Sequence, residues 1–400
     1  MRDRMAMYNA NALQIGIFGA NCSSGRAATR VPERWSASWP DCLGLTRLAD
    51  KAGIDFMLPI GRWKGYGGDT DFHGTTLETV TAAAGLLAAT ERITVFGTVH
   101  APLFHPLIAA KAFVTADHIG EGRFGLNLVA GWNEGEFEMF GVRQRDHAAR
   151  YAFAQEWLDA VKRAWAEPGA FDVAGQFLTL RGVRAEPKPY GNTRPIIMNA
   201  GSSATGQAFA LRNCDAFFTA TAASRMSLEG SARKVQEVKS EARRLGREIE
   251  VYTVGQVICR PRQTEAEDYY RHAIIENADW GAVEGMLALK NITPQTVSPE
   301  DYAAKRQYFA ANAIGGYPFV GTPDRVAEEL AAISRAGVRG IAVSFVNYLD
   351  EPAAFLRRGA AAAGFAGNAL TRRFDGRPSL PASRNGHTRT KIVAQALSTN

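Results

Sequence analysis

The segment Gly122–Trp132, GRFGLNLVAGW, determines how the rest of the chain is interpreted. Its apolar run from Phe124 to Val129 is bounded by glycines, a pattern typical of a strand buried in a parallel sheet. Asn127 interrupts the run, and a carboxamide inside a buried strand needs hydrogen-bond partners. Because the C-terminal ends of parallel strands carry the ligand loops of α/β enzymes, residues 130–136 are predicted to form a polar loop beside a site. The alternative is an ordinary loop, with an asparagine that its core neighbours satisfy.

Seven further apolar runs of strand length alternate with helical periodicities along the chain. These predicted strands cover residues 13–18, 55–59, 93–99, 195–199, 216–219, 250–258 and 340–345. The main predicted helices cover residues 77–89, 106–118, 146–165, 226–245 and 321–336. Residues 171–189 are expected to form a small β excursion, and residues 277–319 an insertion. The alternation predicts an α/β fold, a single (β/α)8 TIM barrel with insertions over residues 1–370.

The composition limits the class of protein. An apolar content of 46% and a charged content of 22% are those of a soluble globular chain with a large core. No apolar stretch is long enough to cross a bilayer, and no secretory leader is evident, so a membrane is not an expected partner. The four cysteines are far apart with no C-x-x-C pair, which argues against a metal site and favours a cytoplasmic location.

The net charge of +6 is concentrated at the C-terminus. Residues 371–400 contain six Lys and Arg residues against one carboxylate, Asp375, which leaves residues 1–370 nearly neutral. A nearly neutral body argues against nucleic acid as a partner. The polar, basic segment 371–400 is predicted to be disordered, with anion or partner binding as the alternative.

Three other segments contain candidate site residues. The loop 61–68, GRWKGYGG, combines glycines with aromatic and cationic residues, which suits close approach of a ligand or simply a flexible turn. Thr98 lies near the end of the third predicted strand. The segment 200–206, AGSSATG, opens a helix whose free N–H groups suit a phosphate, although serine caps are common without any ligand.

With these segments assembled, residues 13–365 resemble the luciferase-like flavin-dependent monooxygenases. Within that family the chain looks closest to the branch that contains the pyrimidine monooxygenase and the dimethylsulfone monooxygenase. The segments that carry the resemblance are 58–68, 122–132, 200–206 and 321–330. The resemblance implies FMN as FMNH2, O2 as co-substrate, a small-molecule substrate, a separate NAD(P)H-dependent flavin reductase and a homo-oligomer.

The resemblance also implies roles for individual residues. The residues expected at the flavin are Gly61 and Arg62, Asn127 at the isoalloxazine edge, Glu136 near the ribityl chain, and Arg150, Tyr151 and Ser203 at the phosphate end. Thr98 and Asn127 match the pair that positions dioxygen over the flavin N5 atom in the pyrimidine enzyme. His73 and the loop 99–105 depart from that enzyme, so the pocket is expected to take a substrate other than uracil. His73, His100 and His105 are candidate proton donors, with packing or capping as the alternative for each.

The function expected from the resemblance is that of a two-component FMNH2-dependent monooxygenase, an oxidoreductase that cleaves a C–N or C–S bond in a small organic substrate such as a heterocyclic amide. One alternative is an FMN- or deazaflavin-dependent dehydrogenase of the same barrel family, against which the Thr98–Asn127 pair argues. The other is a non-catalytic flavin-binding protein. The substrate, the reductase, and oxygen chemistry at N5 or at C4a stay open.

Overall fold

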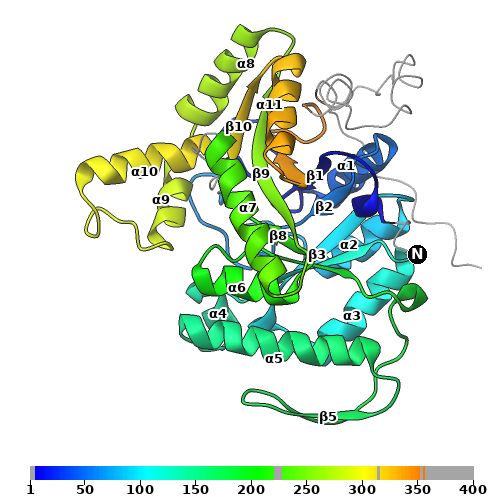
Figure 1. The fold of residues 1–400 in the computed structure, drawn as a ribbon. Helices are drawn as coiled ribbons and strands as arrows, with labels where there is room; N and C mark the ends of the chain where they lie inside the picture. Colours follow the sequence, from blue (N-terminus) through cyan, green and yellow to red (C-terminus); the bar gives the residue numbers. More distant parts are fainter. Residues whose placement is uncertain (1–4, 220–227, 313–315, 352–354, 356–400) are drawn as a thin grey trace, which may run out of the picture.

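The computed structural model describes residues 5–219, 228–312, 316–351 and 355 of the chain. Eight parallel strands close into a barrel in the order β9, β11, β1, β2, β3, β4, β7 and β8, and pairing of β8 with β9 completes the ring (Figure 1). The strands are β1 (Gln14–Phe18), β2 (Phe56–Leu58), β3 (Thr94–His100), β4 (Phe124–Val129), β7 (Ile196–Asn199), β8 (Ala216–Phe218), β9 (Glu250–Cys259) and β11 (Gly340–Ser344). All eight predicted strands, and with them the TIM barrel, are therefore confirmed.

Helices follow the strands and pack around the barrel. They are α1 (Trp39–Lys51), α2 (Thr79–Ala88), α3 (Pro106–Ile119), α5 (His147–Ala166), α6 (Ala204–Asn213), α7 (Leu228–Arg244) and α11 (Pro323–Arg335). Several begin at a side-chain cap that is recognisable in the sequence. Asp146, for example, accepts the backbone N–H of Ala149 at 2.9 Å and starts α5.

The apolar side chains form one core inside the barrel and another between the strands and the helices. Alternate residues of a strand point to opposite faces, so Phe96 of β3, Met198 of β7 and Val254 of β9 all face inward. The N-terminal end of the barrel is closed by the segment that contains Met7, whose carbonyl accepts a hydrogen bond from the buried Gln14. The interior is thus a packed core at this end, and any ligand must enter from the other.

The structure corrects one prediction about the connecting segments and adds detail to another. Residues 130–136 are not a loop throughout, because α4 (Glu134–Met139) begins within them, and acidic residues in its first turn favour a helix N-terminus. The predicted insertion 277–319 contains α9 (Trp280–Ala288), α10 (Pro299–Asn312) and the start of a ninth strand, β10 (Tyr317–Gly321). β10 pairs in parallel with the last residues of β9, outside the closed ring, and covers an edge that the long β9 would otherwise expose.

The remaining elements lie between these. The predicted β excursion is confirmed as a hairpin of β5 (Phe171–Ala174) and β6 (Thr179–Val183), and α8 (Gln263–Tyr270) continues into a π-helical turn, Arg271–Glu276. Among the described residues, none of the helices is both long and apolar enough to cross a membrane. The basic segment 371–400 lies outside the described residues, so the prediction of disorder and the boundary at residue 370 stay predictions.

Candidate functional site

The barrel interior changes from apolar to polar at the C-terminal ends of the strands. Thr98 follows Phe96 on the inward face of β3, and its register partner on β4 is Asn127. The Asn127 Nδ2 donates to Thr98 Oγ1 at 3.1 Å, and the Thr98 hydroxyl donates to the Pro59 carbonyl at 2.6 Å. The Asn127 Oδ1 is buried and has no partner among the described residues. The hydroxyl thus orients the carboxamide, whose oxygen and second N–H are left for a ligand.

Glu136 of α4 connects the loop after β4 to the loop after β2. Its Oε1 accepts hydrogen bonds from Arg62 Nη1 and from the backbone N–H of Trp63, each at 2.8 Å. The Arg62 and Glu136 side chains are only 5% and 1% exposed, so this is a buried ion pair. The Arg62 guanidinium also lies 4.8 Å from the centre of the Tyr66 ring and 5.1 Å from that of Trp132. The pair therefore fixes both loops beside the Thr98–Asn127 pair.

Gly61 allows the first of these loops to approach the barrel wall. A Cβ at this position would stand 3.0 Å from the Thr98 carbonyl oxygen and 3.2 Å from the Thr98 methyl carbon. A side chain at this position would therefore require Thr98 or the loop to shift by a few tenths of an ångström. The sequence requirement at Gly61 is therefore one of close packing, and it places the neighbouring Arg62 over the mouth.

The N-terminal ends of α5 and α6 carry the three residues predicted at the phosphate. Arg150 and Tyr151 lie in the first turns of α5, and Ser203 is the N-cap of α6. Arg150 Nη1 donates to the Gly131 carbonyl at 2.6 Å, while its Nε is buried without a partner among the described residues. The Tyr151 hydroxyl hydrogen-bonds the Ser203 side chain, and a Cβ on Gly201 would come within 2.6 Å of that hydroxyl. Ser203 caps α6 by accepting the Gly206 N–H at 3.1 Å. A guanidinium, two hydroxyls and a helix N-terminus form a set of groups suited to a phosphate.

The three candidate histidines have different environments. Burial lowers the pKa of His73 to about 3 and that of His100 to about 4, so both rings are neutral at neutral pH. The His73 Nε2 donates to the Gly25 carbonyl, which leaves the unpartnered Nδ1 as a hydrogen-bond acceptor. This arrangement does not favour the expected proton-donor role of His73, which stays a prediction. His105 caps α3 by accepting the Leu107 N–H at 3.3 Å, as the capping alternative predicted.

One polar residue at the mouth was overlooked in the sequence. Gln256 lies on β9, is 3% exposed, and has no hydrogen-bond partner for either amide atom among the described residues. The pattern that could have revealed it is the one that revealed Asn127, a carboxamide within an apolar strand. In the strand 250–258, however, polar residues such as Thr253 also occur, so Gln256 did not stand out.

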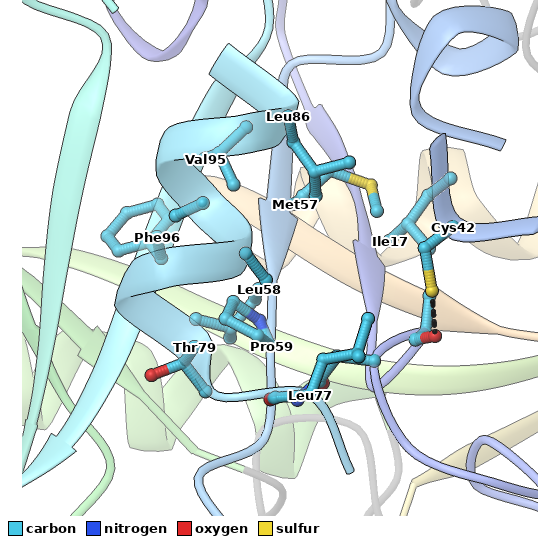
Figure 2. Close-up of a pocket in the computed structure, with 14 residues that line it drawn as sticks. Ile17, Cys42, Met57, Leu58, Pro59, Leu77, Thr79, Leu86, Val95 and Phe96 are labelled. Carbon is cyan, nitrogen blue, oxygen red and sulfur yellow. Dashed lines mark hydrogen bonds between the residues drawn. The ribbon is translucent and has the colours of Figure 1, made fainter. Parts of the chain in front are cut away.

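A small cavity of about 20 Å³ lies elsewhere, between the barrel wall and helices α1 and α2 (Figure 2). Its lining is mostly apolar and includes Ile17, Met57, Leu86 and Val95. The Cys42 thiol at its side donates to the Ala20 carbonyl at 3.2 Å. Because these side chains belong to the outer core, the cavity is a packing gap and not part of the candidate site.

Comparison with known proteins places this geometry in context. A family model for luciferase-like monooxygenases matches residues 13–340. An FMNH(2)-dependent dimethylsulfone monooxygenase of Pseudomonas putida is 29% identical over 350 residues, which cover 85% of this chain and 92% of the relative. The pyrimidine monooxygenase RutA of Methylorubrum populi is 30% identical over 296 residues, which cover 71% of this chain and 76% of the relative.

Solved structures show the same fold at lower sequence identity. A riboflavin lyase (RcaE) with modified FMN and riboflavin superposes with a TM-score of 0.77 at 20% identity, covering 88% of this chain and 92% of that one. DmoA from Hyphomicrobium sulfonivorans superposes with a TM-score of 0.77 at 18% identity, covering 89% of each chain. At these identities the likeness concerns the fold, and the chemistry must be argued from the residues.

Proposed function

The chain belongs to the luciferase-like monooxygenase family, and from this premise we propose that it is the oxygenase of a two-component system that oxidises and cleaves a C–N or C–S bond in a small organic substrate. Its cofactor is FMN in the reduced form, and O2 is its co-substrate, which the name of its FMNH(2)-dependent dimethylsulfone monooxygenase relatives supports. The single structural observation that carries the proposal is the Thr98–Asn127 pair, which presents an amide donor at the polar end of the barrel.

The described residues fit FMN at three points. Arg150, Tyr151 and Ser203 supply the cation, the hydroxyls and the helix N-terminus that a phosphate needs. Arg62 and Glu136 form the wall next to Gly61, and Asn127 offers an unpartnered carbonyl oxygen suited to a ring N–H. Three buried atoms, Arg62 Nε, Asn127 Oδ1 and Arg150 Nε, have no partner among the described residues, and such atoms are costly without a ligand, which supports a cofactor site at these three residues.

Reduced FMN supplies the electrons that activate O2, and the chain positions the reactants and excludes water. The second Asn127 N–H is the donor for negative charge that develops on oxygen, and Thr98 holds the amide in the orientation that makes this possible. The buried Arg62–Glu136 pair and the aromatic rings of Tyr66 and Trp132 enclose the mouth. His73, with its free Nδ1, is assigned to the substrate side of the pocket as a hydrogen-bond acceptor.

The test is FMNH2-dependent turnover. Chemically reduced FMN, O2 and the purified protein are mixed with a panel of cyclic amides, sulfones, sulfonates and chlorinated aromatics, and products are followed by mass spectrometry. We expect at least one substrate to gain an oxygen atom from 18O2, and no turnover with a reduced deazaflavin. In a parallel assay with oxidised FMN or oxidised deazaflavin, hydride transfer from a panel compound to the oxidised cofactor without oxygen uptake would instead establish a dehydrogenase.

The proposal includes a partner and a location. A separate flavin reductase that oxidises NAD(P)H supplies FMNH2, since the sequence has no nicotinamide fingerprint after its first strand. A homo-oligomer is proposed from the family resemblance. A cytoplasmic location is supported by Cys22, Cys42, Cys214 and Cys259, all of which are free and buried.

A further inference from the structure

The carboxamide of Gln256 is buried at the mouth of the barrel with both polar atoms unpaired among the described residues. The residues beside Gln256 in the sheet offer its amide no hydrogen-bond partner. The register partner on β11, Ser344, donates its hydroxyl to the Gly255 carbonyl at 3.2 Å, and the partner on β10 is Pro318, which has no polar side-chain atom. A buried amide that lacks partners in the protein costs stability, which makes Gln256 a candidate for binding a ligand.

The strand order places Gln256 across the mouth from the Thr98–Asn127 pair. Inward-facing residues on β9 alternate, and Gln256 follows Val254 on the same face. Three strands separate β9 from β3 in either direction around the eight-stranded ring, so the two are diametrically opposed. Gln256 is as buried as Thr98 and Asn127, at 3% against 7% and 6% exposed, and all three point to the inside of the barrel.

A second buried glutamine provides the contrast. Gln14 lies on β1 at the closed, N-terminal end of the barrel and is fully buried. Its Nε2 donates to the Met7 carbonyl, and its Oε1 accepts the Tyr252 hydroxyl at 2.5 Å. Gln14 therefore satisfies both amide atoms within the protein. Gln256, the corresponding residue type at the open end, satisfies neither, as expected of a ligand-binding group.

We propose that Gln256 binds the polar edge of the substrate, and that this edge carries an adjacent N–H and C=O, as in a lactam, an imide or a urea. A carboxamide offers a donor and an acceptor side by side, and a cis-amide edge is complementary to both. The assignment rests on the proposed function, because it needs a substrate beside the cofactor. It narrows that substrate to amide-like compounds, for which a sulfone, with acceptors only, is a poor match.

The position of Gln256 favours the substrate over the flavin as its ligand. The residues assigned to the phosphate lie on α5 and α6, which follow β4 and β7, and the assigned oxygen-binding pair lies on β3 and β4. These elements form one half of the ring. β9 lies in the other half, between β8 and β11, and none of the residues assigned above to FMN lies on these three strands. Gln256 is thus available to the molecule that shares the mouth with the cofactor.

The first arm of the test uses the flavin-free protein and needs no turnover. Gln256→Met keeps the length of the side chain and removes the unpaired amide, so we expect the melting temperature to rise by about 1–3 °C. The matched control is Gln14→Met, which leaves the Tyr252 hydroxyl and the Met7 carbonyl unpaired. This variant should lower the melting temperature by several degrees. A fall in the melting temperature of Gln256→Met would show that this amide has a structural partner and would overturn the proposal.

The second arm uses the FMN-loaded protein and two probes, glutarimide and N-methylglutarimide. Calorimetry should show that the wild-type protein binds glutarimide at least about tenfold more tightly, since only this probe keeps the N–H. Gln256→Met should abolish that preference and leave the FMN dissociation constant within about twofold. The absence of any preference in the wild-type protein, or a tenfold loss of FMN affinity in Gln256→Met, would each overturn the proposal. If both of these tests give the expected results but no compound in the panel is turned over with FMNH2, only the proposed function is refuted.

Discussion

Replacement of Thr98 by valine tests whether its hydroxyl orients the Asn127 amide for the catalytic role proposed for it. The substitution keeps the shape of the side chain and removes two hydrogen bonds, one to the Pro59 carbonyl and one from the Asn127 Nδ2. Because Thr98 donates its only proton to Pro59, it cannot itself donate to oxygen, and its effect must pass through Asn127. Loss of a donor to a developing oxyanion costs about 2.7–4 kcal/mol, or roughly 10²–10³ in rate, which we expect for Asn127→Ala. Thr98→Val, which only releases the amide, should lower the rate about 10- to 100-fold, or roughly 1.4–2.7 kcal/mol.

The assay is stopped-flow mixing of the enzyme, FMNH2 and substrate with oxygenated buffer, followed by product quantification. Thr98→Ser keeps the hydroxyl and should retain most of the wild-type rate. The matched control is Thr94→Val, the same change on the same strand. Thr94 is fully buried, and its Oγ1 has no partner among the described residues, so its removal should leave the rate unchanged. FMNH2 affinity should change little in any of the three threonine variants.

A wild-type rate in Thr98→Val would refute this reasoning, because the amide would then be oriented without the hydroxyl. An equal loss of rate in Thr94→Val would also refute it, since that result would attribute the effect to the strand and not to the hydrogen bond. The stability of each variant is checked by its melting temperature. Two polar groups left unpaired by Thr98→Val should cost about 1–3 kcal/mol each, so measurements are made well below the transition.

Three further outcomes are expected. Arg150→Ala should weaken FMN binding by about 1.5–3 kcal/mol in a fluorescence titration, whereas Arg163→Ala on the same helix should not; equal affinity in both variants would remove Arg150 from the phosphate site. Burial raises the pKa of Asp55 to about 7, so the folded protein holds this proton more tightly than the unfolded chain, and stability is lost as the pH rises from about 4 to about 7. Asp55→Asn should therefore show a smaller fall in melting temperature between about pH 5 and about pH 8 than the wild type, and an identical fall would contradict the assignment. Removal of the residues after Asn368 should leave the melting temperature and FMN binding unchanged because this segment is too polar to bury much apolar area; a drop of several degrees would show that it packs on the barrel.

The local sequence was sufficient to locate the eight strands and most helices. Strands buried on both faces need continuous apolar runs, and such runs, bounded by glycines or by caps such as Asp146, are visible without any tertiary information. The alternation of strands and helices then leaves few topologies, of which the barrel is one. The same reasoning predicted a ligand loop after the strand that contains Asn127, and the family resemblance added the prediction that Asn127 and Thr98 lie beside the flavin; the structure confirms that the two residues are neighbours on β4 and β3.

Partnerships between distant residues needed the tertiary structure. The acidic residue that pairs with Arg62 is 74 positions away, on a helix that the sequence suggested was a loop. Whether a carboxamide is satisfied depends on its neighbours in space, so Gln14 and Gln256 cannot be told apart by residue type or by strand pattern. His73 is a further case, because its tautomer follows from a hydrogen bond to Gly25, a residue on another loop.

The pairing of β10 with β9 also depends on contacts between segments that are distant in the sequence. The sequence predicted an insertion up to residue 319 and no strand at Tyr317–Gly321, because the partner of β10 is the edge left unpaired by the long β9, which only the tertiary structure provides. The pattern of apolar and polar residues along the chain indicates which face of a helix or strand is buried, because burial of a side chain depends mainly on its own hydrophobicity. Hydrogen-bond partners, protonation and sheet edges depend on what the closed barrel brings together, and these are the properties on which the chemistry of the site depends.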